Sequence, residues 1–198
     1  MKAVILDMYG VILKETGDGF VPYVNLTFPN LTQDEIYDPW FKADVGEISS
    51  LEVFKRLGFE GDLAQIQKKY LDTIEINAEF YSFATKIKQH CKLALISNDS
   101  SDWSSYFREK IDLNKYFDII SVSGDLKIKK PDERIFLLTA QKLGCATSDC
   151  TYIDDRRYNL EAAQALGMDT VLFNSRNVPY DGKIVRSFKE LEAVLTTS

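Results

Sequence analysis

Polar side chains directly follow three short apolar segments of this chain, and their types suit one kind of chemistry. Asp7 closes the first segment, Ser97 and Asn98 close a second, and the acidic pair Asp154-Asp155 closes a third. These positions offer a carboxylate nucleophile, a hydroxyl and an amide that can donate hydrogen bonds, and two further carboxylates. The set suits phosphoryl transfer, in which most of the acceleration comes from positioning and from neutralising charge on the moving group.

Two further requirements of that chemistry are a fixed cation and a metal site. Lys130 is the candidate cation, because it precedes Pro131, whereas the other lysines of the same run are expected to remain in a solvated loop. Mg²⁺ prefers oxygen ligands, one or two carboxylates together with waters and a phosphate oxygen, and Asp7 with the Asp154-Asp155 pair could provide them. Without a metal, an anionic nucleophile and an anionic substrate would repel each other.

Buried strands alternating with helices are expected to position these residues. Short segments rich in Val, Ile, Leu, Tyr and Phe predict strands, and amphipathic stretches between them, such as 131–143, predict helices. This alternation predicts an α/β fold, a three-layer, Rossmann-like parallel sheet covered on both faces, with ligands at the carboxyl edge of its strands. The predicted strands are 3–7, 92–97, 117–121, 151–154 and 170–173.

The interval from 15 to 82 breaks this alternation. It contains no convincing strand, and helical patterns occupy 51–57 and 63–74. We therefore expect a helical cap at 15–82, inserted after the first strand and packed onto a core formed by 1–14 and 83–198.

The ordered motifs resemble those of the haloacid dehalogenase superfamily, in particular its small sugar-phosphate phosphatases with a helical cap of the C1 type. The family's first motif, Asp-x-Asp-Gly-[Thr/Val], is similar to Asp7 to Val11. Its second, a Ser or Thr after a strand, is similar to Ser97. A Lys commonly followed by Pro and an acidic pair complete the set, at Lys130-Pro131 and Asp154-Asp155. Each motif alone is weak, but four in the right order make accidental matching improbable.

The resemblance implies a role for each motif residue. Asp7 would attack phosphorus and form an aspartyl-phosphate, which water then hydrolyses. Ser97, Asn98 and Lys130 would hold the phosphoryl oxygens. Mg²⁺ would be bound by Asp7, by the Asp154-Asp155 pair and by the backbone carbonyl of residue 9, while the cap would close over the substrate and exclude water.

Tyr9 departs from the family pattern. The family's phosphatases usually carry a second Asp at this position, as the general acid to the leaving oxygen. A phenol stays protonated at neutral pH and can donate a hydrogen bond, but it is a poor base for activating water. Tyr9 is therefore either a catalytic hydroxyl or a packing ring, and the two interpretations are evenly balanced.

Three functions remain open on the sequence. The first is a phosphatase that acts on a small phosphorylated metabolite, for example a sugar phosphate. The second is a 2-haloacid dehalogenase, which characteristically has Tyr at the position of Tyr9 but needs no metal, so that the Asp154-Asp155 pair would be an unexplained concentration of negative charge. The third is a non-catalytic binding or regulatory protein of the same fold.

The overall composition argues against some classes of binding partner and some cellular locations. The net charge of -6 argues against nucleic acid, which attracts clustered Lys and Arg, and no apolar run approaches the length that spans a bilayer. Cys91, Cys145 and Cys150 lack metal-type spacing and are expected to be free thiols. These features predict a cytoplasmic location. They predict no oligomeric state.

Overall fold

A computed structural model describes residues 2–196, and its central feature is one six-stranded sheet with all its strands parallel. The strand order is β3-β2-β1-β4-β5-β6. The strands are β1 (Ala3–Leu6), β2 (Lys92–Ser97), β3 (Ile119–Val122), β4 (Cys150–Asp154), β5 (Asp169–Phe173) and β6 (Lys183–Val185). Strand β1 therefore lies in the middle, between β2 and β4.

The central strand is apolar on both sides because both faces of the sheet are covered. All four residues of β1 are buried. Val4 and Leu6 pack into one hydrophobic cluster, whereas Ala3 and Ile5 point into a second cluster on the opposite face. This alternation gives the sheet two separate cores.

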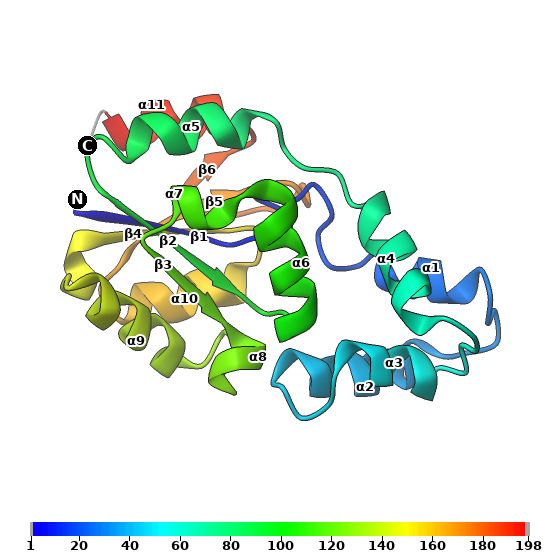
Figure 1. The fold of residues 1–198 in the computed structure, drawn as a ribbon. Helices are drawn as coiled ribbons and strands as arrows, with labels where there is room; N and C mark the ends of the chain where they lie inside the picture. Colours follow the sequence, from blue (N-terminus) through cyan, green and yellow to red (C-terminus); the bar gives the residue numbers. More distant parts are fainter. Residues whose placement is uncertain (1, 197–198) are drawn as a thin grey trace.

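Helices cover both faces of the sheet (Figure 1). Helices α5 (Glu79–Ile87) and α11 (Phe188–Thr196) bury Phe80 and Phe188 in the first cluster, and α9 (Glu133–Leu143) and α10 (Arg157–Ala165) bury Phe136 and Leu160 in the second. The three-layer, Rossmann-like α/β fold predicted from the sequence is thereby confirmed. The remaining core helices are α6 (Ser101–Ile111), α7 (Leu113–Tyr116), α8 (Ser123–Leu126) and the 3-10 turn Thr147–Asp149.

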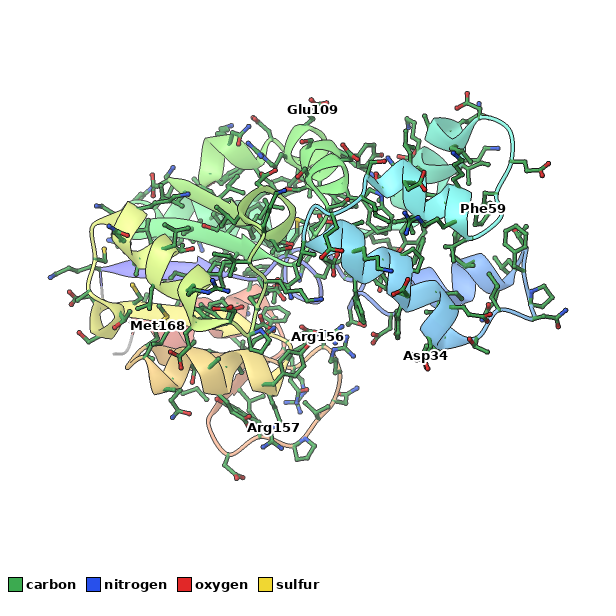
Figure 2. The ribbon with its side chains drawn as sticks, turned by 90° about the horizontal axis from the view of Figure 1, so that it is seen from below. Asp34, Phe59, Glu109, Arg156, Arg157 and Met168 are labelled. Carbon is green, nitrogen blue, oxygen red and sulfur yellow. The ribbon has the colours of Figure 1, made fainter. Side chains whose placement is uncertain are left out.

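Four helices group beyond the carboxyl ends of the strands, on the side opposite the two chain ends (Figure 1). They are α1 (Phe20–Asn25), α2 (Gln33–Asp44), α3 (Ser50–Arg56) and α4 (Leu63–Thr73). Side chains cap the starts of three of them: Thr32 and Glu35 form a capping box at α2, and Ser49 and Asp62 cap α3 and α4. Figure 2 shows this group from another side, with Asp34 marking α2.

Aromatic contacts hold the four helices to the core. The ring of Phe20 in α1 packs edge-on against that of Trp103 in α6, with 5.3 Å between the ring centroids. Within the group of four helices, the centroid of the Phe20 ring lies 5.1 to 5.7 Å from those of Trp40, Phe54 and Tyr70. The indole N–H of Trp103 also donates to Oε1 of Gln67 in α4 over 3.0 Å. Because α6 itself packs in the hydrophobic cluster on one face of the sheet, these contacts fix α1 to α4 over the carboxyl edge of the strands.

The boundary between cap and core needs adjustment. A boundary between residues 82 and 83 would cut α5, whose side chains pack against α11 and the sheet. We propose instead that the cap ends between α4 and α5, within residues 74–78. Among the described residues, no helix is both long enough and apolar enough to cross a membrane.

Candidate active site

Strands β1, β2 and β4 are neighbours in the sheet, so the polar residues at their carboxyl ends meet. Asp7 directly follows β1, and its N–H donates to the carbonyl of Ile153 in β4 over 2.9 Å. Oδ1 of Asp7 accepts a hydrogen bond from the N–H of Met8 over 2.6 Å. The sheet itself therefore fixes the position of this carboxylate.

Lys130 lies between two of the predicted carboxylates. Its Nζ is 2.7 Å from Oδ1 of Asp7 and 2.9 Å from Oδ2 of Asp154, and the residue is only 3% exposed. Asn98 holds the main chain of Lys130 from both sides: the Lys130 N–H donates to Asn98 Oδ1 over 2.8 Å, and Asn98 Nδ2 donates to the Lys130 carbonyl over 2.9 Å. Asn98 thus positions the lysine that the sequence analysis selected.

The buried charges shift one another's protonation. Burial alone would lower the pKa of Lys130, but the negative charges of Asp154 and Asp7 outweigh it and raise the pKa above its usual value. The pKa of Asp7 is raised well above its usual value, first by burial and then by the charge of Asp154. For Asp154, burial acts to raise the pKa, but the charge of Lys130 and the hydrogen bonds from Tyr152, Lys130 and the N–H of Arg156 prevail and lower it.

The two members of the acidic pair have different surroundings. Asp154 accepts hydrogen bonds from Lys130 Nζ, the Tyr152 hydroxyl, Asn159 Nδ2 and the N–H of Arg156. Among residues 2–196, the Asp155 side chain has a single hydrogen-bond partner, the Nε of Arg176, 2.5 Å from its Oδ2.

The protonation of Asp155 differs accordingly. Burial, together with the charge of Asp154, raises the pKa of Asp155 to about 6. Asp154 is therefore saturated with donors and stays ionised, while Asp155 keeps oxygen lone pairs free for another partner.

Gly10 makes the close approach of Asp155 possible. Its φ of 77° lies in the left-handed region that favours glycine. A Cβ added here would stand 2.6 Å from Oδ2 of Asp155. A side chain at position 10 would therefore displace the carboxylate from the loop after β1.

Three carboxylates form a group that could hold a divalent cation. One oxygen each from Asp7, Asp154 and Asp155 lies within 4.8 Å of the others, and all three residues are buried. Hard oxygen ligands in this number suit Mg²⁺ better than a softer metal. The donor set fits the magnesium predicted from the sequence.

Two predicted residues have unpaired hydroxyls. The Ser97 hydroxyl is fully buried at the end of β2, and the Tyr9 hydroxyl is buried beside the cavity; neither has a hydrogen-bond partner among the described residues. The Tyr9 ring packs edge-on against Phe107 with 6.2 Å between the ring centroids, so the residue also serves as a packing ring. Burial, and then the charge of Asp99, raises the pKa of Tyr9 well above its usual value.

A cavity of about 350 Å³ lies next to the Asp7 carboxylate, between the sheet and the cap. Core residues Asp7, Asn98 and Lys130 line it on one side, and Trp40 and Asp44 of α2 line it on the other. Its size is at the lower end of the range of about 300 to 1,000 Å³ for ligand pockets, which favours a small ligand.

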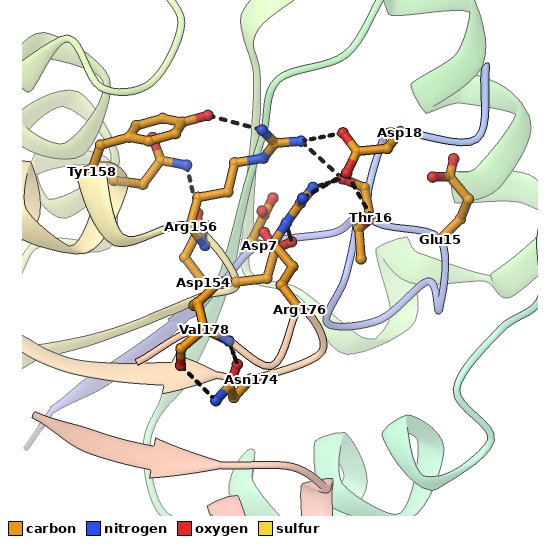
Figure 3. Close-up of polar contacts among 12 residues, drawn as sticks. Asp7, Glu15, Thr16, Asp18, Asp154, Arg156, Tyr158, Asn174, Arg176 and Val178 are labelled. Atoms are coloured by element: carbon orange, nitrogen blue, oxygen red, sulfur yellow. Dashed lines mark hydrogen bonds and ion pairs between the residues drawn. The ribbon is translucent and has the colours of Figure 1, made fainter. Parts of the chain in front are cut away.

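Sequence reasoning missed two arginines and one cap carboxylate. Arg176, after β5, binds Asp155. Its guanidinium also donates to Oδ2 of Asp18 over 2.6 Å and to the carbonyl of Thr16 over 2.5 Å (Figure 3). Arg156 donates to the same Thr16 carbonyl over 2.9 Å. Arg176 could have been predicted as a site residue, because it lies just beyond the predicted strand 170–173. Asp44 could not, because it lies in a segment without a motif.

The chain matches only a part of the length of two curated relatives. The chain is 25% identical to drimenol cyclase drtB of Aspergillus calidoustus over an alignment of 186 positions, which covers 89% of this chain and 35% of that protein. It is 30% identical to phosphoglycolate phosphatase of Escherichia coli over 79 residues, which are 40% of this chain and 31% of that enzyme. The chain thus spans about a third of the length of these relatives.

Solved structures share the fold at low sequence identity. A HAD family enzyme of Bacteroides thetaiotaomicron, crystallised with magnesium and inorganic phosphate, has a TM-score of 0.75 at 18% identity, over 91% of this chain and 98% of that one. A 2-haloacid dehalogenase of Pseudomonas syringae pv. tomato has a TM-score of 0.71 at 18% identity, over 100% of this chain and 99% of the other. Both likenesses concern the fold.

The family itself follows from a sequence match that covers most of the chain. The sequence model of the haloacid dehalogenase-like hydrolase family matches residues 4–173, from β1 to the end of β5. This stretch includes the whole of α1 to α4 and the predicted site residues Asp7, Ser97, Asn98, Lys130 and Asp154-Asp155, but not Arg176. The resemblance seen in the sequence motifs is confirmed: the chain belongs to the haloacid dehalogenase-like hydrolase family.

Proposed function

We propose that the protein is a magnesium-dependent hydrolase that removes phosphate from a small phosphorylated metabolite through an aspartyl-phosphate on Asp7. One observation carries this proposal. The Asp7 carboxylate lines a small cavity, a buried lysine contacts it, and two further carboxylates lie within 4.8 Å. A nucleophile, a fixed cation and a metal site are the parts that phosphoryl transfer requires.

Asp7 has one oxygen available for the reaction. Both of its contacts among the described residues, with Met8 and Lys130, use Oδ1, so Oδ2 is free of hydrogen bonds. In the proposed first step an Asp7 carboxylate oxygen attacks phosphorus, the ester bond to the leaving oxygen breaks, and that oxygen takes up a proton. In the second step water attacks phosphorus, the bond between phosphorus and Asp7 breaks, and inorganic phosphate leaves.

The remaining predicted residues would hold the phosphoryl group. Lys130 is ionised at neutral pH and would offset the charge on the phosphoryl oxygens. Asn98 would act through Lys130, because its amide is bonded to the lysine main chain, and Ser97 would supply its unpaired hydroxyl. The Tyr9 hydroxyl could donate a hydrogen bond to the leaving oxygen. Its raised pKa makes it a weak acid and keeps it protonated, so it is not available as the base that activates water, and we expect slow turnover.

The metal would be bound mainly by Asp7 and Asp155. Asp154 already accepts four hydrogen bonds, so we assign it chiefly to holding Lys130 and only secondarily to the metal. The backbone carbonyl of Tyr9 would complete the protein ligands. Bound Mg²⁺ would supply positive charge that offsets repulsion between an anionic nucleophile and an anionic substrate.

Two relatives support a phosphatase. The matched relative from Escherichia coli is a phosphoglycolate phosphatase, and the similar structure from Bacteroides thetaiotaomicron contains magnesium and inorganic phosphate. The substrate of this chain does not follow from either, because the first match covers 79 residues and the second shares only the fold.

A 2-haloacid dehalogenase is the second candidate. It is favoured by Tyr9, which that class of enzymes characteristically carries, and by the similar fold of the Pseudomonas dehalogenase. We rank it second because three buried carboxylates outnumber the two cations that contact them, Lys130 and Arg176, and this excess of buried negative charge would be unfavourable without a metal. A non-catalytic binding protein of this fold is the third candidate.

One panel of assays separates the three. Phosphorylated metabolites are offered with Mg²⁺ and with EDTA, alongside 2-chloropropionate, and phosphate and chloride are measured. Metal-dependent phosphate release is the expected result, and metal-independent chloride release would replace the proposal with the second candidate. No turnover of either, with Mg²⁺ or phosphate still raising the Tm, would favour the third.

A further inference from the structure

The proposed reaction needs a group that exchanges protons, and Tyr9 does not supply one. The leaving oxygen takes up a proton in the first step, and water loses one in the second. Burial keeps the Tyr9 hydroxyl protonated, so it cannot accept the proton of water. Outside the proposed nucleophile and metal ligands, two carboxyl groups that line the cavity have a buried oxygen without a hydrogen-bond partner among the described residues, those of Asp44 and Asp99.

Asp44, at the end of α2, suits this exchange better than Asp99, which follows β2. Burial, and then the charge of Asp44, raises the pKa of Asp99 well above its usual value and favours its neutral form. For Asp44, burial raises the pKa only to about 7, because Lys129 and Arg156 act to lower it. Asp44 is therefore present both as acid and as base at neutral pH, as proton transfer in both directions requires.

A close backbone contact holds the end of α2 against the core. Gly46, two residues after Asp44, has a φ of 67°, in the left-handed region that favours glycine. A Cβ added to Gly46 would collide with the carbonyl oxygen of Gly124 in α8, and the N–H of Gly124 donates to the carbonyl of Asp99 over 3.0 Å. The cap backbone therefore rests directly on the core at this point, and Asp44 is held near the end of β2.

The cavity gives Asp44 and the nucleophile access to the same ligand. Asp7 and Asp44 both line this space of about 350 Å³. The charges of Asp44 and of Asp7 both raise the pKa of Asp99, which shows that both carboxyl groups are near it. A phosphomonoester with its phosphorus at Asp7 would fill much of so small a cavity, so its leaving oxygen would come within reach of Asp44.

We propose that Asp44 is the general acid and base of the reaction, a catalytic residue that the cap supplies in place of the aspartate missing at position 9. This inference rests on the proposed phosphatase function. In the first step an Asp7 oxygen bonds to phosphorus, the bond from phosphorus to the leaving oxygen breaks, and the Asp44 carboxyl gives its proton to that oxygen. In the second step the Asp44 carboxylate takes a proton from the water that bonds to phosphorus, and the electron pair of the breaking bond returns to Asp7.

This role gives a reason for a carboxyl in so unfavourable a place. A buried acceptor without a donor destabilises the fold, and such costs are typical of functional sites. Asp44 reaches the cavity only while the cap rests on the core. Turnover is therefore expected to be slower than with an Asp in the loop that carries Asp7.

Two esters with the same ring test the acid step. The leaving oxygen of phenyl phosphate needs a proton, whereas that of 4-nitrophenyl phosphate leaves readily without one. Asp44→Asn is expected to lower kcat/KM about 100-fold or more for phenyl phosphate, the usual effect of removing a general acid, and less than about tenfold for 4-nitrophenyl phosphate. Equal losses on the two esters, or no loss on phenyl phosphate, would overturn the inference.

The pH dependence gives a second measurement. The ionisable groups that interact with Asp44 are Tyr9 after β1, Asp99 after β2, Lys129 before α9 and Arg156 before α10. For phenyl phosphate, kcat/KM should fall as the pH rises above about 7, because Asp44 then loses the proton that the leaving oxygen needs. Asp44→Asn should abolish this fall, and a fall that persists unchanged in the variant would assign it to another group and overturn the inference.

Asp38→Asn is the matched control. Asp38 is on the same helix but is exposed, pairs with Lys42 over 2.7 Å and does not line this cavity. Its replacement should leave kcat/KM for both esters as in the unaltered protein.

Rescue from position 9 separates proton transfer from a structural role. Once Tyr9→Asp supplies a carboxyl beside the nucleophile, adding Asp44→Asn should cost about tenfold less in kcat/KM for phenyl phosphate than it does in the unaltered protein. The same loss in both backgrounds would overturn the inference. Phosphate release by the unaltered protein that Asp44→Asn leaves undiminished would refute the role of Asp44 alone, whereas no release by the unaltered protein from any phosphomonoester would refute the proposed function as well.

Discussion

Replacing Asp44 by Asn is expected to stabilise the protein, and to do so more strongly as the pH rises. Asp44 is buried with one oxygen unpaired, and burial raises its pKa from 3.8 to about 7. The folded protein therefore holds this proton more tightly than the unfolded chain. Between about pH 4 and pH 7 the unfolded chain loses the proton first, so the free energy of unfolding falls as the pH rises.

The expected size of the effect follows from the pKa shift. A rise of the pKa from 3.8 to about 7 means that the buried Asp44 carboxylate destabilises the folded protein by roughly 4 kcal/mol. This destabilisation is fully present above pH 7 and absent below about pH 4. Asn keeps the shape of the side chain but carries no charge. The gain in stability of Asp44→Asn should therefore grow by up to about 4 kcal/mol from pH 4 to pH 8.

Urea unfolding followed by circular dichroism, in EDTA and at several pH values, measures this gain. The Asp38→Asn variant is the control, because its exposed ion pair with Lys42 should change the stability by no more than about 1 kcal/mol at any pH. A difference between Asp44→Asn and the unaltered protein that stays constant from pH 4 to pH 8 would refute this reasoning.

Three further substitutions test the centre of the site. Lys130→Met leaves Asp7 and Asp154 without their common cation, so phosphate release should be lost and stability at pH 8 should fall by about 3 to 5 kcal/mol in urea unfolding; a loss under 1 kcal/mol would contradict the buried pairing. Tyr9→Asp should raise the rate of phosphate release about tenfold or more if a missing acid limits turnover, and an unchanged kcat would argue that it does not. Arg176→Leu removes the cation on Asp155 and should lower the Kd of Mg²⁺ several-fold in calorimetry at pH 8, whereas weaker binding would show that Arg176 supports the metal site.

The sheet could be predicted from the sequence because its strands are apolar, short and separated by helices. Strand β2 has the predicted bounds, and β1, β3, β4 and β5 differ from prediction by one or two residues. Strand β6 (Lys183–Val185) was missed, because three residues carry too little pattern. The helix predicted from Pro131 begins at Glu133 instead, because the Asp132 side chain accepts from the N–H of Arg134 and caps it.

The cap was harder to resolve. Helices α3 and α4 were predicted within one residue at each end, but α1 and α2 were not. Pro39 stands inside α2 and normally argues against a helix, because it lacks an N–H. The capping box at Thr32 and packing around Phe20 outweigh that preference.

In the candidate site, too, the residues of the sheet could be predicted and those of the cap could not. The residues that could be named in advance each follow a predicted strand or carry a motif, and Asp7, Asn98, Lys130 and Asp154-Asp155 do come together. Asp44 could not be named, because it reaches the cavity only through the packing of the cap on the core. Its neighbours in sequence give no chemical signal.

The most direct test of the account is whether Asp7 carries the phosphoryl group during turnover. The protein is mixed with a phosphorylated substrate and Mg²⁺, quenched in acid within the first turnovers, and its peptides are weighed by mass spectrometry. The account predicts that the peptide containing Asp7 gains the mass of one phosphoryl group, only with Mg²⁺ and not in Asp7→Asn. Phosphate release that continues undiminished in Asp7→Asn would contradict it.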